Sequence, residues 1–230
     1  MSYTPPLRMR STQDSNATAA RLLRTLAPLL FIAAGLLAYS NVAGNYFLSD
    51  DFAQIGRVLA GDLSVVWGRE HGGFFRPVFI LSYVFDVALW GRRPFGFHLT
   101  NVLVHALNSF LVSLLARRLF DGAGVAAGRR DAAALGAGLL FLLHPSHTEA
   151  VSWISGRADV LATFFGLLSL LFHLSYAQAR LSDKRTPRRA PLAISFVLSL
   201  LCFALALFAK EAAAFIPLAA LLLGARAAAA

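Results

Sequence analysis

The sequence has little charge and almost no cysteine. Only 14% of its 230 residues are Asp, Glu, Lys or Arg, and 57% are hydrophobic, against roughly a quarter and a half in soluble domains. The single cysteine, Cys202, lies in an apolar run, which excludes a disulfide-stapled secreted domain. A soluble domain of this length cannot bury so much apolar surface, and the composition also excludes a disordered or collagen-like chain. The sequence therefore predicts a polytopic membrane protein.

Lysine is scarce as well, with two lysines beside 19 arginines and a net charge of +9. In a soluble protein this excess would suggest nucleic acid, whereas in a membrane protein basic residues crowd the cytoplasmic ends of spanning helices. We therefore expect no nucleic-acid partner. The abundance of Arg, Ala, Leu and Gly is typical of GC-rich genomes and favours a bacterial inner membrane.

Apolar segments divide the chain into an all-α, polytopic transmembrane helix bundle. We predict six spans, at residues 25–43, 97–116, 132–146, 158–177, 191–209 and 212–224. Residues 25–43 hold 19 residues without a charge, which nearly cross a ~30 Å hydrocarbon core as a helix. A cleaved signal peptide is the alternative, but the run is long and no A-x-A site follows. The polar residues 1–24 predict a disordered cytoplasmic arm.

The segment 74–90 is apolar but contains Arg76 and Asp86, and its placement decides the topology. If it lies flat on the outer surface, the inside holds 14 basic residues and the outside seven. If it spans, the inside holds eight, the outside 12, and Arg76 lies in the membrane. The positive-inside rule favours the first arrangement. Both ends are then cytoplasmic, and the outer loop 44–96 contains interfacial helices.

The chain stops just past its last apolar segment, after LLLGARAAAA. We interpret residues 25–230 as one membrane module and favour an N-terminal fragment of a longer protein over a small stand-alone module.

An acidic pair, Asp50 and Asp51, follows the first predicted span. Adjacent carboxylates can divide labour, one accepting a proton while the other orients it or binds a cation. The alternative is a helix N-cap, because Ser49-Asp50-Asp51 precedes FAQIGRVLAG.

A second polar cluster, HPSHTE, lies at the predicted outer turn between spans three and four. His144, His147 and Glu149 could contact a phosphate or bind zinc or another divalent cation, although the spacing matches no strong zinc motif. The third interpretation is a purely structural polar turn. Because all three interpretations are open, we assign no metal to this turn.

Three further features have both structural and functional interpretations. Span two has a polar stripe at spacings of three, four and three residues, which we expect to face neighbouring helices: His98, Asn101, His105 and Asn108. Two cations at the outer interface, Arg157 and Lys210, suit a lipid phosphate or ordinary snorkelling. Gly136 and Gly138 indicate close helix packing.

Four stretches together resemble the GT-C glycosyltransferases, the membrane enzymes that use polyprenyl-phosphate sugars. They are YFLSDDF, RPVFILSYVFDVALWGRRPFGFHLTNVLVHALNSFLV, HPSHTEAVSWISGRADVLATFF and FAKEAAAFIPLAALLL, and they cover roughly residues 45–225. Within that superfamily the chain is most similar to the membrane half of O-mannosyltransferase-like proteins with tetratricopeptide repeats. No such repeat occurs in this sequence, and the later spans of the family are absent from it.

The resemblance implies inverting transfer of a sugar, mannose by expectation, from a polyprenyl phosphate to an acceptor hydroxyl of a protein or glycan on the periplasmic side. It places the catalytic base at Asp50 or Asp51. We expect Arg157 to contact the phosphate, with Lys210 and the histidines assisting. Glu149, Glu211 and Arg76 are the further candidates for binding the substrate or its phosphate. The resemblance implies the lipid-linked sugar and membrane lipids as partners. The one cofactor that it allows is an optional divalent cation. A lipid-binding transporter and a scaffold subunit are the rival hypotheses.

Overall fold

The structure is a computed structural model that describes residues 25–69, 73–182 and 189–229. Every regular element in these ranges is a helix, which confirms the predicted all-α membrane bundle. The predicted disordered arm, residues 1–24, lies outside the described residues.

A helix occupies each of the six predicted span positions. They are the first helix (Thr25–Ala38), α4 (Pro94–Gly122), α5 (Ala127–Leu143), α7 (Arg157–Ser182), α8 (Arg189–Ala209) and α9 (Ile216–Ala229). Within the described residues, three segments are long and apolar enough to cross a membrane, at Pro94–Gly122, Ile154–Leu181 and Leu192–Ala209. The other three helices are each shorter than 18 residues, although α5 and α9 are at least as long as the spans predicted at their positions.

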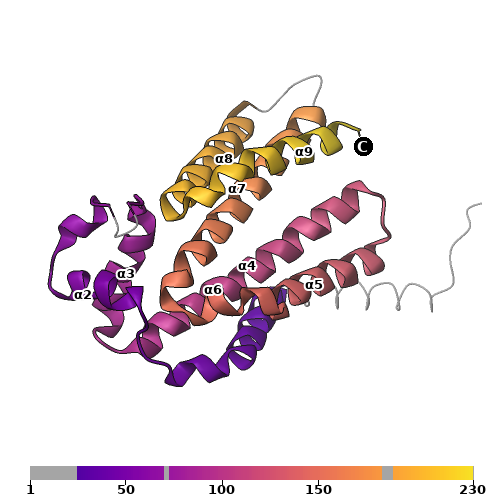
Figure 1. Cartoon of the computed structure of the whole chain (residues 1–230). Coiled ribbons are helices and arrows are strands. Elements are labelled where there is room, and N and C mark those ends of the chain that lie inside the picture. The colour runs from indigo at the N-terminus through magenta and orange to yellow at the C-terminus, as the bar shows by residue number, and fades with distance from the viewer. Residues whose placement is uncertain (1–24, 70–72, 183–188, 230) are drawn as a thin grey trace, which may run out of the picture.

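The helices form two groups around α7 (Figure 1). α8 and α9 pack along α7, while α4 packs against both α5 and α7. Gly138 of α5 is needed at one crossing, because a Cβ atom there would lie 2.5 Å from the Phe31 ring and 2.6 Å from the Ser109 carbonyl oxygen. Gly136 has open space around it, so the prediction of close packing is right for Gly138 and wrong for Gly136.

The polar stripe of α4 faces inward as predicted. All four of its side chains are buried. Asn101 donates to the Trp153 carbonyl at 3.0 Å, Asn108 donates to the Val160 carbonyl at 2.9 Å, and His105 hydrogen-bonds the Leu142 carbonyl at 3.2 Å. These side chains therefore hold α4 against α5, α7 and the connection between them.

The short elements gather at one end of the bundle (left in Figure 1). They are η1 (Ser40–Gly44), α2 (Asp50–Leu59), η2 (Leu63–Val66), α3 (Pro77–Trp90), η3 (Pro145–His147), α6 (Thr148–Ser152), η4 (Ile154–Gly156) and η5 (Glu211–Phe215). Most of them belong to segments predicted to lie outside, while η1 and η5 overlap the outer ends of predicted spans 25–43 and 212–224. The turn from α4 to α5 lies at the opposite end. We call the first end the outer end.

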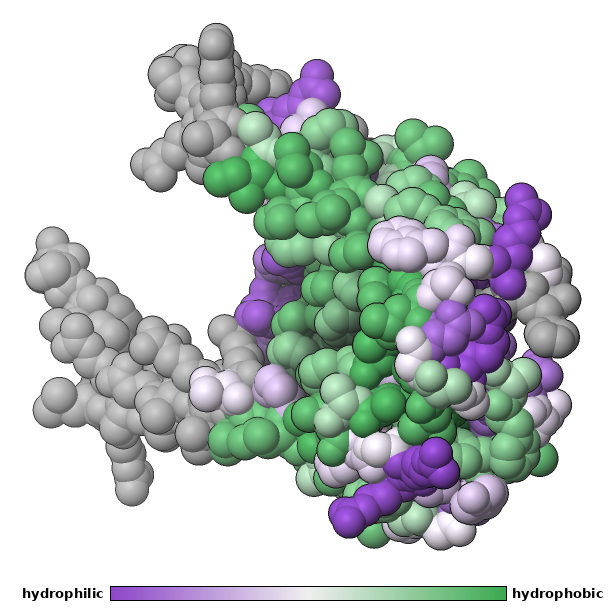
Figure 2. All heavy atoms as spheres, turned by 90° about the vertical axis from the view of Figure 1, so that its left-hand side faces the viewer, coloured by the Kyte–Doolittle hydropathy of each residue, from purple (hydrophilic) through white to green (hydrophobic). Residues whose placement is uncertain are grey.

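Helix α3 is too short to cross a bilayer, since its 14 residues extend about 21 Å against a core of about 30 Å. It buries Phe79, Ile80 and Tyr83 in a cluster with Ile55 of α2 and Phe97 of α4. Viewed toward the outer end, hydrophilic side chains form separate clusters among apolar ones (Figure 2). The outer end therefore has its own packed core and a mixed surface.

Candidate active site

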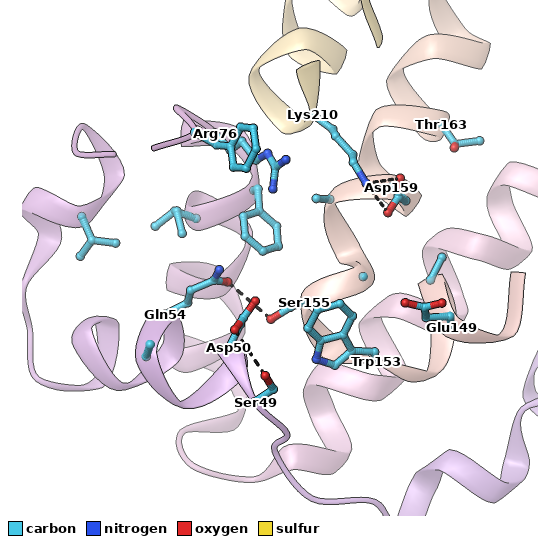
Figure 3. Close-up of a pocket in the computed structure, with 18 of the residues that line it drawn as sticks. Ser49, Asp50, Gln54, Arg76, Glu149, Trp153, Ser155, Asp159, Thr163 and Lys210 are labelled. Carbon is cyan, nitrogen blue, oxygen red and sulfur yellow. Dashed lines mark hydrogen bonds and ion pairs between the residues drawn. The ribbon is translucent and has the colours of Figure 1, made fainter. Parts of the chain in front are cut away.

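A cavity of about 700 Å³ opens at the outer end, between α2, α3, α6, α7 and the start of η5. Its ionisable lining residues are Asp50, Arg57, Arg69, Arg76, His147, Glu149, Asp159 and Lys210. Figure 3 shows Asp50, Glu149, Asp159 and Lys210 arranged around it from four different elements. Residues from all four resembling stretches thus line one cavity, and Glu149 lines the same cavity as Asp50, as predicted.

The two adjacent aspartates have different environments. Asp51 is 1% exposed, and its carboxylate accepts hydrogen bonds from Ser155 N at 2.9 Å, Ser155 Oγ at 2.5 Å and Leu48 N at 2.9 Å. Asp50 is exposed and lines the cavity; within the described residues its carboxylate has only a long contact, 3.4 Å to Ser49 Oγ. Asp51 is therefore occupied in fixing the loop, while Asp50 is free to accept a proton.

The backbone just before the pair is strained. Ser49 has φ 52° and ψ −116°, and it is the one described residue other than glycine with positive φ. The amide of Asp51 donates to the Leu48 carbonyl at 3.1 Å, which closes a turn of type II′ with Ser49 at its first central position. The Ser49 side chain forms no capping hydrogen bond with a backbone amide of α2, so the N-cap interpretation of this sequence receives no support from Ser49.

Two ion pairs involve the Lys210-Glu211 turn, and each brings a cation, Lys210 or Arg76, to the cavity wall. Lys210 Nζ lies 2.6 and 2.7 Å from the two carboxylate oxygens of Asp159. Arg76 binds Glu211 through two nitrogens, at 2.7 and 2.9 Å. These hydrogen bonds from Arg76 lower the pKa of Glu211 below its ordinary value. The turn therefore ties α7 to the start of α3.

Arg157 does not lie where the sequence analysis expected it. Its side chain is buried, forms an ion pair with Asp86 at 2.6 Å, and donates to Asn101 Oδ1 at 2.6 Å and to the Phe97 carbonyl at 2.7 Å. Arg157 therefore pairs with Asp86 and not with Glu149, the partner that its place eight residues after Glu149 predicts. Asp86 is fully buried in the outer-end core, and a buried charge requires a partner of opposite sign. Arg157 joins α3 to α4 and α7, and its guanidinium is not part of the cavity wall.

The HPSHTE sequence forms a compact turn. His144 Nδ1 lies 2.7 Å from Ser146 Oγ, and the His144 and His147 ring centroids are 5.8 Å apart. Partial burial, with a smaller contribution from His144, lowers the pKa of His147, so His147 is neutral near pH 7. It lines the cavity beside Glu149, whereas His144 does not.

The histidines and carboxylates at this end were considered above as ligands of a divalent cation. In the described part of the chain, no three His, Cys, Asp or Glu residues are grouped so that they could hold one metal ion. No step proposed below depends on a metal.

Sequence reasoning missed four residues that contribute to the site. Arg57 and Arg69 supply positive charge, Ser155 holds Asp51, and Trp153 lines the cavity while its indole donates to the Leu48 carbonyl at 3.4 Å. In the sequence, Arg57 and Arg69 contribute only to the count of basic residues on the outer side. Trp153 and Ser155 lie within the third resembling stretch, directly before Gly156-Arg157. This position is the sequence feature that could have indicated their place at the site.

Comparison with known proteins agrees with the sequence motifs. Protein O-mannosyl-transferase tmtc2 of Xenopus laevis is 37% identical over 172 residues, which are 67% of this chain and 19% of that protein. Human protein O-mannosyl-transferase TMTC2 is 34% identical over 179 residues, 70% of this chain and 20% of that protein. Drosophila melanogaster Tmtc1 is 35% identical over 142 residues, 61% of this chain and 14% of that protein.

The chain spans about a fifth of the length of the first of these relatives. No family model and no solved structure matches it. The resemblance inferred from the four stretches is nevertheless confirmed: this membrane protein is similar to a segment of the TMTC protein O-mannosyl-transferases.

Proposed function

We propose that the outer-end cavity transfers mannose from a polyprenyl phosphate to a hydroxyl group of a protein. The relatives' names supply the sugar and the kind of acceptor. The observation that carries the proposal is the cavity itself, where the exposed carboxylate of Asp50 lies on one wall and Arg76 and Lys210 lie on another. The lipid-linked donor, the inverting course and the identity of the base are parts of the same proposal.

The chemistry needs a base and a group that stabilises the leaving phosphate. A Ser or Thr hydroxyl is a weak nucleophile, and a carboxylate within hydrogen-bond reach removes its proton as attack proceeds. The acceptor oxygen bonds to C1 of mannose while the bond from C1 to the phosphate oxygen breaks. The proton passes to Asp50, and the electron pair leaves with the polyprenyl phosphate. Inversion follows because attack and departure occur on opposite faces of C1.

Cations stabilise the negative charge that develops on the leaving phosphate. Lys210, Arg76 and Arg69 are the cavity's candidates for this role, in place of the buried Arg157. Neutral His147 and the carboxylate of Glu149 are placed to hydrogen-bond sugar hydroxyls. The active face lies outside the membrane, which in a bacterium is the periplasmic side of the inner membrane.

A transfer assay on the complete protein in detergent tests the proposal. Radiolabelled polyprenyl-phosphate mannose is incubated with a Ser/Thr-containing acceptor peptide, and GDP-mannose serves as the donor without a lipid. We expect label in the peptide from the lipid donor alone, with the anomeric configuration inverted. Transfer from GDP-mannose, retention of configuration, or no transfer to any hydroxyl would refute it.

A further inference from the structure

The indole of Trp153 lies between two cavities. It lines the outer-end cavity and also a second cavity of about 260 Å³, whose wall includes the loop of residues 45–48. Trp153 is the one described residue that lines both of them. Its ring stacks on no other aromatic ring among the described residues. The indole is therefore a wall between two spaces and not a member of a packed aromatic cluster.

Three hydrogen bonds hold Trp153 in place. Its indole Nε1 donates to the Leu48 carbonyl at 3.4 Å, across 105 positions of sequence. Its amide donates to the Glu149 carbonyl at 3.0 Å, at the end of α6, and its own carbonyl accepts from Asn101 Nδ2 at 3.0 Å. Backbone and ring edge are both held, so the ring is oriented before a ligand arrives. A preorganised surface of this kind loses little conformational entropy on binding.

Trp153 lies where the proposed reaction places the sugar. Figure 3 shows Trp153 between Asp50 on one side and Glu149 on the other, with Lys210 above it. All four side chains line the same cavity. In the proposed transfer, C1 of the sugar lies between the base and the departing phosphate. The sugar ring therefore occupies the space between Asp50 and the cations, which is the space that the indole borders.

An indole face and a pyranose ring are chemically complementary. The face carries the negative part of the aromatic quadrupole, and the C–H groups on one side of a pyranose form an apolar, weakly positive patch. The hydroxyl groups point outward from the ring edge, where the carboxylate of Glu149 can accept their hydrogen bonds. Ligand sites commonly combine an aromatic wall with a few polar groups that fix the orientation of the ligand.

We propose that Trp153 is the sugar-binding surface of the outer-end cavity, on which the pyranose ring of the donor stacks. Trp153 is then a specificity-determining residue that recognises the sugar and not the lipid. This inference rests on the proposed function for the identity of the donor, but the binding step is measurable without transfer.

Equilibrium binding to the purified complete protein tests the proposal with two radiolabelled probes, mannosyl farnesyl phosphate and farnesyl phosphate. The detergent must have no sugar head group, because such a group would compete for the indole. We expect the wild-type protein to bind the mannosyl probe more tightly. Trp153→Leu should lower the affinity for the mannosyl probe about threefold to tenfold, the range that corresponds to one aromatic contact. It should leave the affinity for farnesyl phosphate unchanged, which also shows that the cavity is folded.

Two further variants separate the flat ring from the rest of the side chain. Trp153→Phe retains an aromatic face and should bind the mannosyl probe within about twofold of the wild-type affinity. Trp67→Leu is the matched control, because Trp67 is 74% exposed and does not line the cavity. It should leave both affinities unchanged.

The proposal is overturned if Trp153→Leu weakens both probes equally, as a purely structural role would require, or if it leaves the mannosyl probe unaffected. A raised KM for the acceptor peptide with an unchanged affinity for the mannosyl probe would assign the indole to the acceptor and also overturn it. A wild-type protein that does not prefer the mannosyl probe overturns it too. The expected binding pattern without any mannosyl transfer would instead refute the proposed function and leave this inference standing.

Discussion

Ser155 donates two hydrogen bonds to the same carboxylate oxygen of Asp51, from its amide at 2.9 Å and from its hydroxyl at 2.5 Å, although 104 positions separate the two residues. The contact joins the start of α2 to η4. Because Asp50 directly precedes Asp51, this contact also fixes the position of the proposed base. The second acid of the pair is thus a positioning residue.

Ser155→Ala should lower both stability and transfer, because it removes one of the two bonds to Asp51. Loss of a hydrogen bond to a charged group costs about 1.5–3 kcal/mol. We expect kcat to fall while KM for the donor stays unchanged, since the cationic wall is intact. Ser155→Thr retains the hydroxyl and should restore kcat. Unfolding in detergent and steady-state kinetics measure the two effects, and an unchanged kcat in Ser155→Ala would show that the contact does not position Asp50.

Asp86→Ala should destabilise the protein strongly, because it leaves the guanidinium of Arg157 buried without its carboxylate. Breaking a buried ion pair by removing one partner costs about 3–5 kcal/mol. The double variant Asp86→Leu/Arg157→Met removes both charges and should recover most of the loss. Chemical unfolding of the three proteins checks this, and a double variant no more stable than Asp86→Ala would contradict it.

Ser49→Gly should preserve the fold, and Ser49→Val should impair it. The positive φ of Ser49 suits glycine and is unfavourable for a β-branched residue, with strain of about 1–3 kcal/mol at such positions. The melting temperature should therefore fall in Ser49→Val but not in Ser49→Gly. Equal melting temperatures for the two variants would show that the turn before Asp50 is not strained.

The Arg76–Glu211 ion pair should make stability depend on pH in the acid range. The pKa of Glu211 is lowered in the folded protein from an ordinary value of 4.5, so the unfolded chain binds its proton first. The stabilisation is therefore complete above pH 4.5 and is lost as the pH falls through the lowered pKa.

Thermal unfolding of wild type and Glu211→Gln between neutral and acid pH measures this effect. The two melting curves should differ at neutral pH and converge in acid. Glu149→Gln is the control, because Glu149 lines the same cavity and forms no ion pair within the described residues. A difference in melting temperature between wild type and Glu211→Gln that stays constant from neutral to acid pH would show that the ion pair is not the source of the pH dependence.

The sequence could predict features that depend on local spacing. The inward stripe of α4 follows from helical periodicity, and the shared outer end of Asp50, Glu149 and Lys210 follows from counting basic residues on each side. The pairing of Arg157 with Asp86 could not be predicted, because it depends on how α3 packs over α4 and α7. The same holds for Ser155 and Asp51, whose contact follows from the packing of α2 against η4.

The central claim is that Asp50 is the catalytic base. Transfer of labelled mannose by Asp50→Asn in the complete protein tests it most directly, with donor binding and unfolding measured on the same sample. Asparagine has nearly the same volume but cannot take the hydroxyl proton, and loss of a general base typically lowers the rate by about 10²–10⁴. Asp121→Asn, an equally conservative change at the opposite end of the bundle, is the control. The account predicts that Asp50→Asn folds and binds donor but transfers at least about a hundredfold more slowly; transfer near the wild-type rate would contradict it.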